Sequence, residues 1–308
     1  MITEIDASLL EKIADLTGKP VGAFNIRKDM GCEARQSTER ISIDPRADGK
    51  PGIDIHFKEG TKGETCHIPV IISQTGMSDM VYNDFYVADD CDVTIVAGCG
   101  VHTDGVEDAA HNGIHRFFLE NGSHVIYREK HVGTGNGSGL KRIDPVTFAV
   151  LGPGSALEMD TVQLGGVDRT VRTTSARLAA AARLTIRERI QTDGRDTART
   201  DFTVSMDGDG SAVNLISRSV ARGSSRQTYR SKLIGNCRCS GHSECDAILM
   251  DRGRVDAFPE LIAGCRDASL IHEAAIGRIA GEQIVKLRTL GLSEGEAERR
   301  IIEGFLNG

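Results

Sequence analysis

A short segment in the C-terminal half concentrates residues that could bind a metal. Three thiols and an imidazole lie between positions 237 and 245, contributed by Cys237, Cys239, His242 and Cys245. If residues 237–239 are extended, the first two thiols point to the same face about 7 Å apart, close enough for two irons of one cluster. Thiolate is the ligand that iron-sulfur clusters favour, and histidine or carboxylate can replace one thiolate. The segment therefore predicts iron-sulfur ligation.

Two other interpretations of the same thiols remain open. Cysteine with histidine also suits tetrahedral zinc, although the Cys-x-Cys-x5-Cys spacing is not that of a usual finger or ribbon. Buried cysteines can also act simply as small apolar residues.

A second group of possible ligands precedes this segment. Cys99, flanked by glycines, is predicted to be a metal ligand, and His111 and His115 would share one face of a helix. A zinc- or iron-dependent hydrolase using the His-rich region 99–131 is the alternative function, with Glu107 or Asp108 as general base. The full group comprises Cys99, His102, His111, His115 and His131.

The elements that must position these residues differ along the chain. Residues 1–66 form a lead-in with a predicted helix from Ser8, and residues 67–268 are short apolar runs separated by glycine-rich or charged turns. Repeated strands without long helices allow a sandwich, a propeller or a solenoid. The alanine-rich stretch 175–184 does not fit a pattern of repeated strands, because its helix propensity is high.

The last segment, 269–308, predicts a helical hairpin. A long amphipathic helix is expected from Leu270, Gly291 ends it, and Ser293 with Glu296 has the spacing of a capping box for a second helix. Its apolar stripe must pack on the chain's own domain or on a partner. The stripe consists of Ile276, Ile279, Ile284, Leu287, Leu290, Ala297, Ile301, Ile302 and Phe305.

Composition limits the classes of function. The net charge is −7, and no basic stripe with interleaved aromatic residues is present, which disfavours nucleic-acid binding. No apolar stretch reaches the roughly 18 residues that a membrane span needs, and the first residues lack the pattern of a signal peptide. We therefore expect a soluble, cytoplasmic protein with no membrane partner. Its eight cysteines are then expected to be ligands or free thiols.

Several blocks of sequence resemble one family. They are 96–102, 111–118, 129–135, 235–248 and the C-terminal segment from Leu270 to Phe305, which begins with the dipeptide His272-Glu273. This combination resembles the SufB/SufD family, scaffold subunits of the SUF iron-sulfur cluster assembly machinery, and in particular its minimal SUF-like (SmsB-type) members. The resemblance covers nearly everything from about residue 90 onward.

The resemblance implies a mainly β chain, folded as a right-handed parallel β-helix with a small N-terminal α+β lead-in and a C-terminal helical hairpin. It implies a non-enzymatic scaffold that pairs with itself through the β-helix and binds a SufC-like ABC-type ATPase through the C-terminal helices. The matching His272 and Glu273 would lie at the subunit interface and take part in cluster assembly. The cluster, [4Fe-4S] or [2Fe-2S], would be the bound group.

One departure affects the ligands. Larger SufB proteins carry a Cys-Gly-Ala-His-Thr-Phe-Pro motif where this chain has 252–259 without a cysteine. We infer that other thiols take that place. The predicted metal ligands are Cys237, Cys239, Cys245, Cys99, His272 and Glu273.

Overall fold

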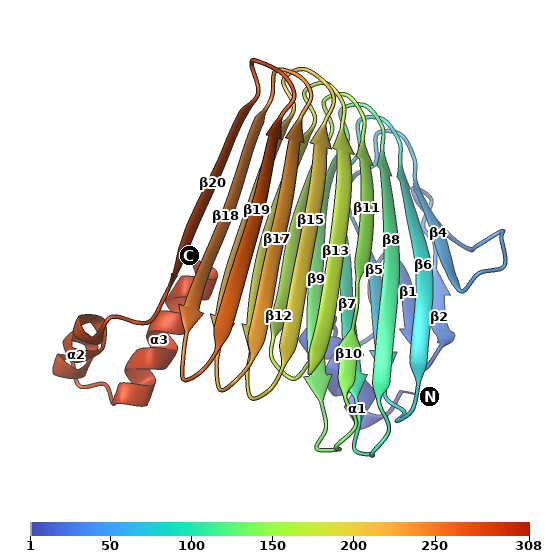
Figure 1. Cartoon of the computed structure of the whole chain (residues 1–308). Helices are drawn as coiled ribbons and strands as arrows, with labels where there is room; N and C mark the ends of the chain where they lie inside the picture. Colours follow the sequence, from blue (N-terminus) through green and yellow to red (C-terminus); the bar gives the residue numbers. More distant parts are fainter. Residues whose placement is uncertain (1) are drawn as a thin grey trace.

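The chain winds into a parallel β-solenoid made of two sheets that face each other across a narrow core. A computed structural model describes residues 2–308, and Figure 1 shows the strands of successive coils stacked side by side. The first sheet contains, in spatial order, β2 (Gly31–Gln36), β1 (Ala23–Lys28), β5 (Lys62–Ile72), β7 (Asp92–His102), β9 (His124–Thr134), β12 (Ala156–Leu164), β14 (Arg183–Thr192), β16 (Ala212–Ala221), β18 (Ser240–Leu249) and β20 (Ser269–Gly277). The second contains β19 (Arg254–Ala263), β17 (Arg226–Gly235), β15 (Thr197–Met206), β13 (Arg169–Leu178), β10 (Lys141–Ile143) with β11 (Val146–Leu151), β8 (Ala109–Leu119), β6 (Ser78–Val87), β4 (Gly52–Phe57) and β3 (Ile41–Pro45).

The mainly β, solenoid fold predicted above is confirmed, and alternation explains it. Along most strands every second residue is buried, so one face points into the core and the other to the surface. Parallel pairing in register then stacks equivalent residues of successive coils. Phe85 and Phe117 are such neighbours, with ring centroids 4.5 Å apart and an interplanar angle of 10°. The same row continues through Ala149, Ala176, Val204 and Leu233.

The alanine-rich stretch forms a corner of the solenoid. Strand β13 ends at Leu178, the next strand begins at Arg183, and Ala182 between them is fully buried. Ala181 adopts a left-handed φ of 57°, which costs on the order of 1 kcal/mol. Packing of the stacked coils therefore overrides the local helix propensity.

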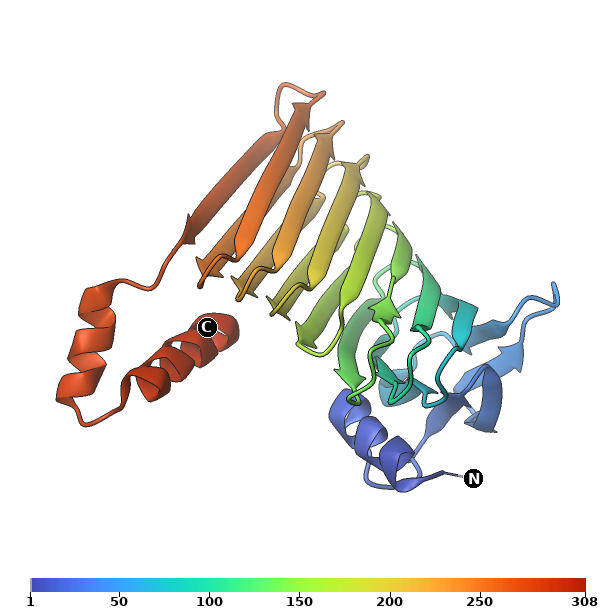
Figure 2. The ribbon, with the colours of Figure 1, turned by 60° about the horizontal axis from the view of Figure 1, so that its bottom comes forward.

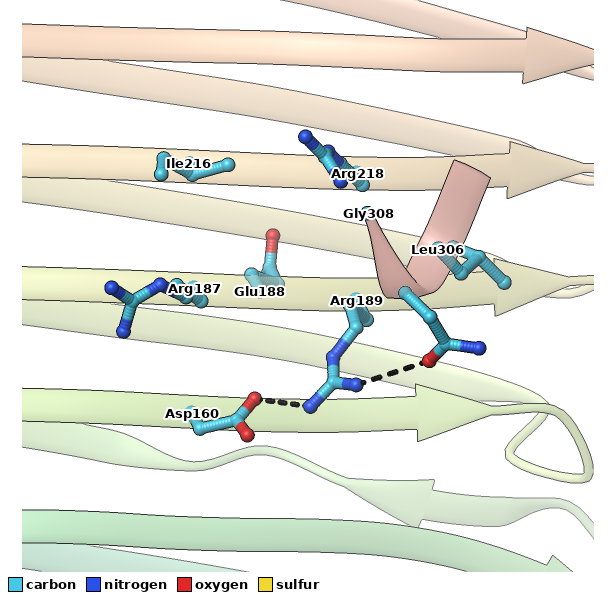
Figure 3. A pocket seen from close by; sticks show the side chains of 9 residues that line it. Asp160, Arg187, Glu188, Arg189, Ile216, Arg218, Leu306 and Gly308 are labelled. Carbon is cyan, nitrogen blue, oxygen red and sulfur yellow. Dashed lines mark hydrogen bonds and ion pairs between the residues drawn. The ribbon is translucent and has the colours of Figure 1, made fainter. Parts of the chain in front are cut away.

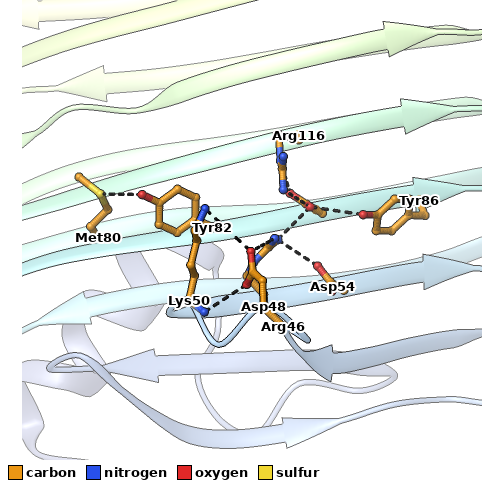
Figure 4. A network of polar contacts seen from close by, with 9 residues as sticks. Arg46, Asp48, Lys50, Asp54, Met80, Tyr82, Tyr86 and Arg116 are labelled. Carbon is orange, nitrogen blue, oxygen red and sulfur yellow. Dashed lines mark hydrogen bonds and ion pairs between the residues drawn. The ribbon is translucent and has the colours of Figure 1, made fainter.

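The N-terminal lead-in continues both sheets. Strands β1 and β4 pair in parallel with β5 and β6, while β2 and β3 add antiparallel at the end. Nearby, the largely buried Arg46 forms ion pairs with Asp48, Asp54 and Asp84, and Arg116 also reaches Asp84, as Figure 4 shows. These ion pairs connect the loop before β4 to strands β6 and β8.

Helix α1 (Glu4–Ala14) covers the outer face of β7. Its N-cap is Thr3, in a capping box with Asp6, so the helix begins earlier than the Ser8 start predicted from sequence. A side chain at Gly98 would come within 2.6 Å of the Ile13 carbonyl oxygen, and one at Gly100 within 3.0 Å of Leu9. The glycines around Cys99 therefore admit α1 to the surface of the strand.

The prediction that a helix begins at Leu270 is wrong. Residues 269–277 form β20, which pairs in register with β18. Backbone hydrogen bonds to β18 therefore outweigh the local helical spacing of the apolar residues. Helix α2 (Gly281–Thr289) starts only after it, and α3 (Glu294–Asn307) has the predicted capping box of Ser293 and Glu296. Among the described residues, no helix is long and apolar enough to cross a membrane.

The two C-terminal helices are held differently. Helix α3 packs Ile302 and Leu306 against Val220 of β16. Helix α2 buries none of its residues, and Figure 2 shows it standing away from the sheets. The C-terminal end of α3 lines an open pocket of about 220 Å³ in which Arg189 reaches both Asp160 and Asn307, as Figure 3 shows.

Candidate functional site

The solenoid has an open end, the coil formed by β19 and β20. Both are edge strands of their sheets, so within residues 2–308 no further strand covers them. Residues on β18 and β20, and in the corners beside them, include most of the predicted ligands. The chemistry of this end therefore depends on which of these side chains meet.

Three side chains on the outer face of the open end converge. His242, Glu244 and Glu273 each bring a ligand atom within 4.8 Å of the others, and no other such group of three occurs among residues 2–308. His242 and Glu244 are two apart on β18 and share a face, and Glu273 is the register partner of Glu244 on β20. Imidazole nitrogen and carboxylate oxygens suit a divalent ion such as Fe²⁺.

The tautomer of His242 supports a cation at this place. Its Nδ1 lies 2.9 Å from the amide oxygen of Asn214, which can only accept, so Nδ1 carries the proton. In the neutral ring, Nε2 then points its lone pair at Glu273 Oε2, 3.3 Å away. Two electron-rich atoms at that distance repel unless a cation or a second proton lies with them. A metal ion would satisfy both.

His272 lies on the other side of the same strand. Adjacent residues of a strand point to opposite faces, so His272 faces the core while Glu273 faces out. Its Nδ1 lies 3.3 Å from the hydroxyl of Ser243, and burial lowers its pKa, which favours the neutral ring. The structure therefore separates these two predicted ligands.

Two predicted cysteines meet in the corner before β18. Cys237 and Cys239 are not in an extended strand, contrary to the geometry assumed from sequence, and the thiol of Cys237 lies 3.4 Å from the Met206 carbonyl oxygen, to which it donates. Burial, and next the neighbouring Cys237 thiol, raise the pKa of Cys239. Cys265, in the following corner, is close enough to add to this effect. Gly235 makes room, because a side chain there would come within 2.9 Å of Cys239 Sγ.

The structure does not bring Cys245 to this corner. It lies on the inner face of β18, where burial raises its pKa to about 12. Six residues of extended chain separate it from Cys239, a distance of roughly 20 Å. Cys245 is therefore a buried thiol of the core, away from the paired thiols.

Cys99 belongs to a different site. It lies on β7, five strand spacings from β18 in the sheet, or about 24 Å. A cavity of about 10 Å³ inside the solenoid is lined by its side chain and by His111, His115, Glu129 and His131. The two histidines of β8 share a face as predicted, but through the alternation of a strand and not through a helix.

This cavity does not suit the hydrolase alternative. It has about the volume of one water molecule, so no substrate fits beside the imidazoles. Glu107 and Asp108, the predicted bases, lie in the loop between β7 and β8. His102 lies at the end of β7, with its nitrogens 2.9 Å from Thr134 Oγ1 and 3.1 Å from Asp104 Oδ2.

Sequence reasoning missed Glu244 and Cys265 and did not include His242 among the ligands. The alternation of His242 and Glu244 on one strand face was a usable signal, since residues two apart in a strand lie side by side. The approach of Cys265 to Cys239 had no signal, because it depends on the length of the intervening coil.

Comparison with known proteins gives the family. The family model for the SUF system FeS cluster assembly SufBD core domain matches residues 72–305. An iron-sulfur cluster assembly SufBD family protein of Methanothermobacter thermautotrophicus (strain Winter) is 25% identical over 241 residues, 77% of this chain and 58% of that protein. A SufBD family protein of Archaeoglobus fulgidus is 40% identical over 101 residues, 32% of this chain and 27% of that protein. The chain thus spans less than two thirds of the length of these relatives. The chain belongs to the SufBD family, whose name links it to iron-sulfur cluster assembly.

Proposed function

We propose that this chain is a cytoplasmic scaffold on which an iron-sulfur cluster is assembled at the open end of the solenoid. The observation that carries the proposal is the pairing of two ligand groups at that end. His242, Glu244 and Glu273 offer nitrogen and oxygen ligands for iron, and Cys237 with Cys239 offer neighbouring thiols, near enough that Cys237 raises the pKa of Cys239. Family membership supports cluster assembly as the purpose of this arrangement.

The two ligand groups have different tasks in this proposal. The outer group is accessible, since the Glu273 side chain is 67% exposed, and it would take up incoming iron. The paired thiols, which lose their protons on binding metal, would hold the cluster as thiolates. The scaffold itself would do no ATP chemistry.

A second copy of the chain is the partner that fits the open end. The edges of β19 and β20 present unpaired backbone groups, and apolar side chains are exposed beside them, including Leu261, Ile262 and Ile276. A symmetric pair of such ends would cover both edges and place the iron ligands of the two copies near one interface.

An ABC-type ATPase resembling SufC is the partner proposed for the C-terminal helices. Helix α2 is available for it, with Val285 59% and Leu290 74% exposed, whereas α3 is already docked on β16. The free apolar surface of α2 is therefore the part of the hairpin expected to bind.

Iron and sulfide analysis after anaerobic reconstitution tests the proposal. Wild-type protein should hold both elements, and a His242→Ala/Glu244→Ala variant should take up iron at least tenfold more weakly. His124→Ala is a matched control, because His124 is also a surface histidine between two carboxylates, Asp92 and Glu158. Absence of iron and sulfide from the wild type would refute the scaffold function.

A further inference from the structure

The cavity inside the solenoid has ligands that cluster assembly at the open end does not use. We propose that it binds a single transition-metal ion through His111 Nε2, His115 Nε2 and Cys99 Sγ. The proposal is independent of the proposed function, because the cavity lies about five strand spacings, or about 24 Å, from the open end.

The imidazoles of His111 and His115 border the space that a side chain at position 113 would fill. His111, Gly113 and His115 alternate along β8 and all face inward. The position that a Cβ would occupy at Gly113 lies 3.0 Å from His115 Nε2 and 3.5 Å from His111 Nε2. Glycine at this position therefore keeps open a space that both nitrogens border.

Hydrogen bonds place the proton of His115 on Nδ1 and leave Nε2 free to bind a metal. Tyr127 donates its hydroxyl proton to Glu129 Oε1 at 2.8 Å, so its oxygen must accept from His115 Nδ1, 2.7 Å away. Nε2 is then left with its lone pair, and its neighbour at 3.4 Å is the amide nitrogen of Asn83, a weak donor contact.

The two nitrogens of His111 face different groups: Nε2 borders the space at Gly113, and Nδ1 faces a carboxylate. The residue is only 4% exposed, yet its Nδ1 makes no hydrogen bond and lies 3.5 Å from Asp79 Oδ2. An ion on Nε2 would fix the proton on Nδ1, facing that carboxylate. A carboxylate behind a metal-bound imidazole is the usual arrangement in metal sites.

His131 is excluded as a ligand although it lines the same cavity. Its Nδ1 faces Arg172 Nη2 at 3.4 Å, and its Nε2 faces Glu129 Oε1 at 3.4 Å. Because the guanidinium can only donate, Nδ1 accepts and Nε2 carries the proton. Neither nitrogen is free.

Cys99 completes the site from the opposite sheet. Its thiol lines the cavity and is shielded on the outer side by α1. The three donor atoms do not all lie within 4.8 Å of one another, so binding requires these side chains to move toward a common centre. Two imidazoles and a thiolate suit Zn²⁺, Co²⁺ or Fe²⁺. The ion would join the two sheets across the core.

Cobalt binding under anaerobic, reducing conditions tests this site. The chain should carry Cys237→Ser, Cys239→Ser, His242→Ala and Glu244→Ala, which remove both neighbouring thiols and two of the three outer ligands of the open end. One Co²⁺ per chain is expected, with visible ligand-field bands and a thiolate-to-cobalt charge-transfer band. Absence of bound cobalt, or a spectrum without the charge-transfer band, would overturn the proposal.

Substitutions locate the ion. Gly113→Ala places a methyl group in the space between the imidazoles and should weaken cobalt binding at least tenfold, whereas Gly18→Ala, with open space around it, should not. Cys99→Ala replaces one small buried side chain by another and should abolish the charge-transfer band even if Gly113→Ala fails to fold. Unchanged binding in Gly113→Ala, or an unchanged band in Cys99→Ala, would contradict the assignment.

Discussion

At the scale of residues, hydrogen-bond partners decide which nitrogen of a candidate ligand histidine carries the proton. Asn214 sets the proton of His242, and Tyr127 sets that of His115. In both cases the nitrogen that faces a candidate metal position is left with its lone pair. Such partners decide which histidines can act as ligands.

Replacing Asn214 tests this at the open end. An Asn214→Leu variant loses the acceptor for His242 Nδ1, so the imidazole is no longer held in its ligand tautomer. We expect iron or manganese binding to weaken by about 10- to 100-fold. Titration calorimetry with Mn²⁺ would measure it, and equal affinity in wild type and variant would show that Asn214 does not orient a ligand.

The buried charges of the core make a stability prediction. Arg172 is buried between Glu129 and Glu188, with nitrogen-oxygen distances of 2.7 and 3.4 Å. Arg172→Met leaves two buried carboxylates without their cation and should cost about 3–5 kcal/mol. Arg177→Met removes an exposed pair with Asp207 and should change stability by less than about 0.5 kcal/mol. Urea unfolding would compare them, and equal losses would contradict the account.

At the scale of elements, local spacing predicted a few features, and the packing of one coil on the next decided the rest. The shared face of His111 and His115 and the capping box of Ser293 followed from local spacing. Two features could not be predicted from local spacing: Cys265 lies near Cys239, and residues 269–277 form a strand. Both depend on how one coil stacks on the next. The alanine corner shows the same limit, since stacking overrides propensity.

Helix α1 gives a pH-dependent prediction. Burial acts to raise the pKa of Asp6, but the Lys28 ammonium at 2.6 Å and the Thr3 hydrogen bonds outweigh it, so this pKa lies below its usual value of 3.8. The resulting stabilisation is complete above pH 3.8 and is lost as the pH falls through the folded-state value.

An Asp6→Asn variant should therefore unfold more easily than wild type at pH 7, by about 2 kcal/mol. The difference should shrink below pH 3.8, where the wild-type carboxylate also becomes protonated. Urea unfolding at a series of pH values would measure this. A difference that stays constant down to pH 2 would show that the charge of Asp6 does not stabilise the helix.

At the scale of the whole molecule, the two ends of the solenoid are treated differently. Both ends finish in two edge strands, but β2 and β3 at the N-terminal end pair antiparallel with their neighbours, whereas β19 and β20 at the other end expose apolar side chains such as Leu261 and Ile276. Unprotected edges with apolar side chains are uncommon in monomers. This difference in exposed apolar side chains supports the proposal that a second copy binds the open end.

The proposed dimer makes its own prediction. Leu261→Asp, at an open-end position that is 38% exposed, should convert a dimer into a monomer by burying a charge at the interface. Val150→Asp, at 49% exposed on a middle strand, should leave the dimer intact. Light scattering after size-exclusion chromatography distinguishes the two. A monomeric wild type, or dissociation by both variants, would contradict the interface.

Assembly of a cluster at the open end requires the thiols of Cys237 and Cys239, so cysteine substitution is the decisive experiment. Iron and acid-labile sulfide would be measured after anaerobic reconstitution of wild type, of Cys237→Ser/Cys239→Ser, and of Cys245→Ser. We predict that wild type and Cys245→Ser hold the cluster and that the double variant loses it, because Cys245 lies roughly 20 Å from the pair. A double variant that keeps its cluster, or a Cys245→Ser variant that alone loses it, would contradict this account.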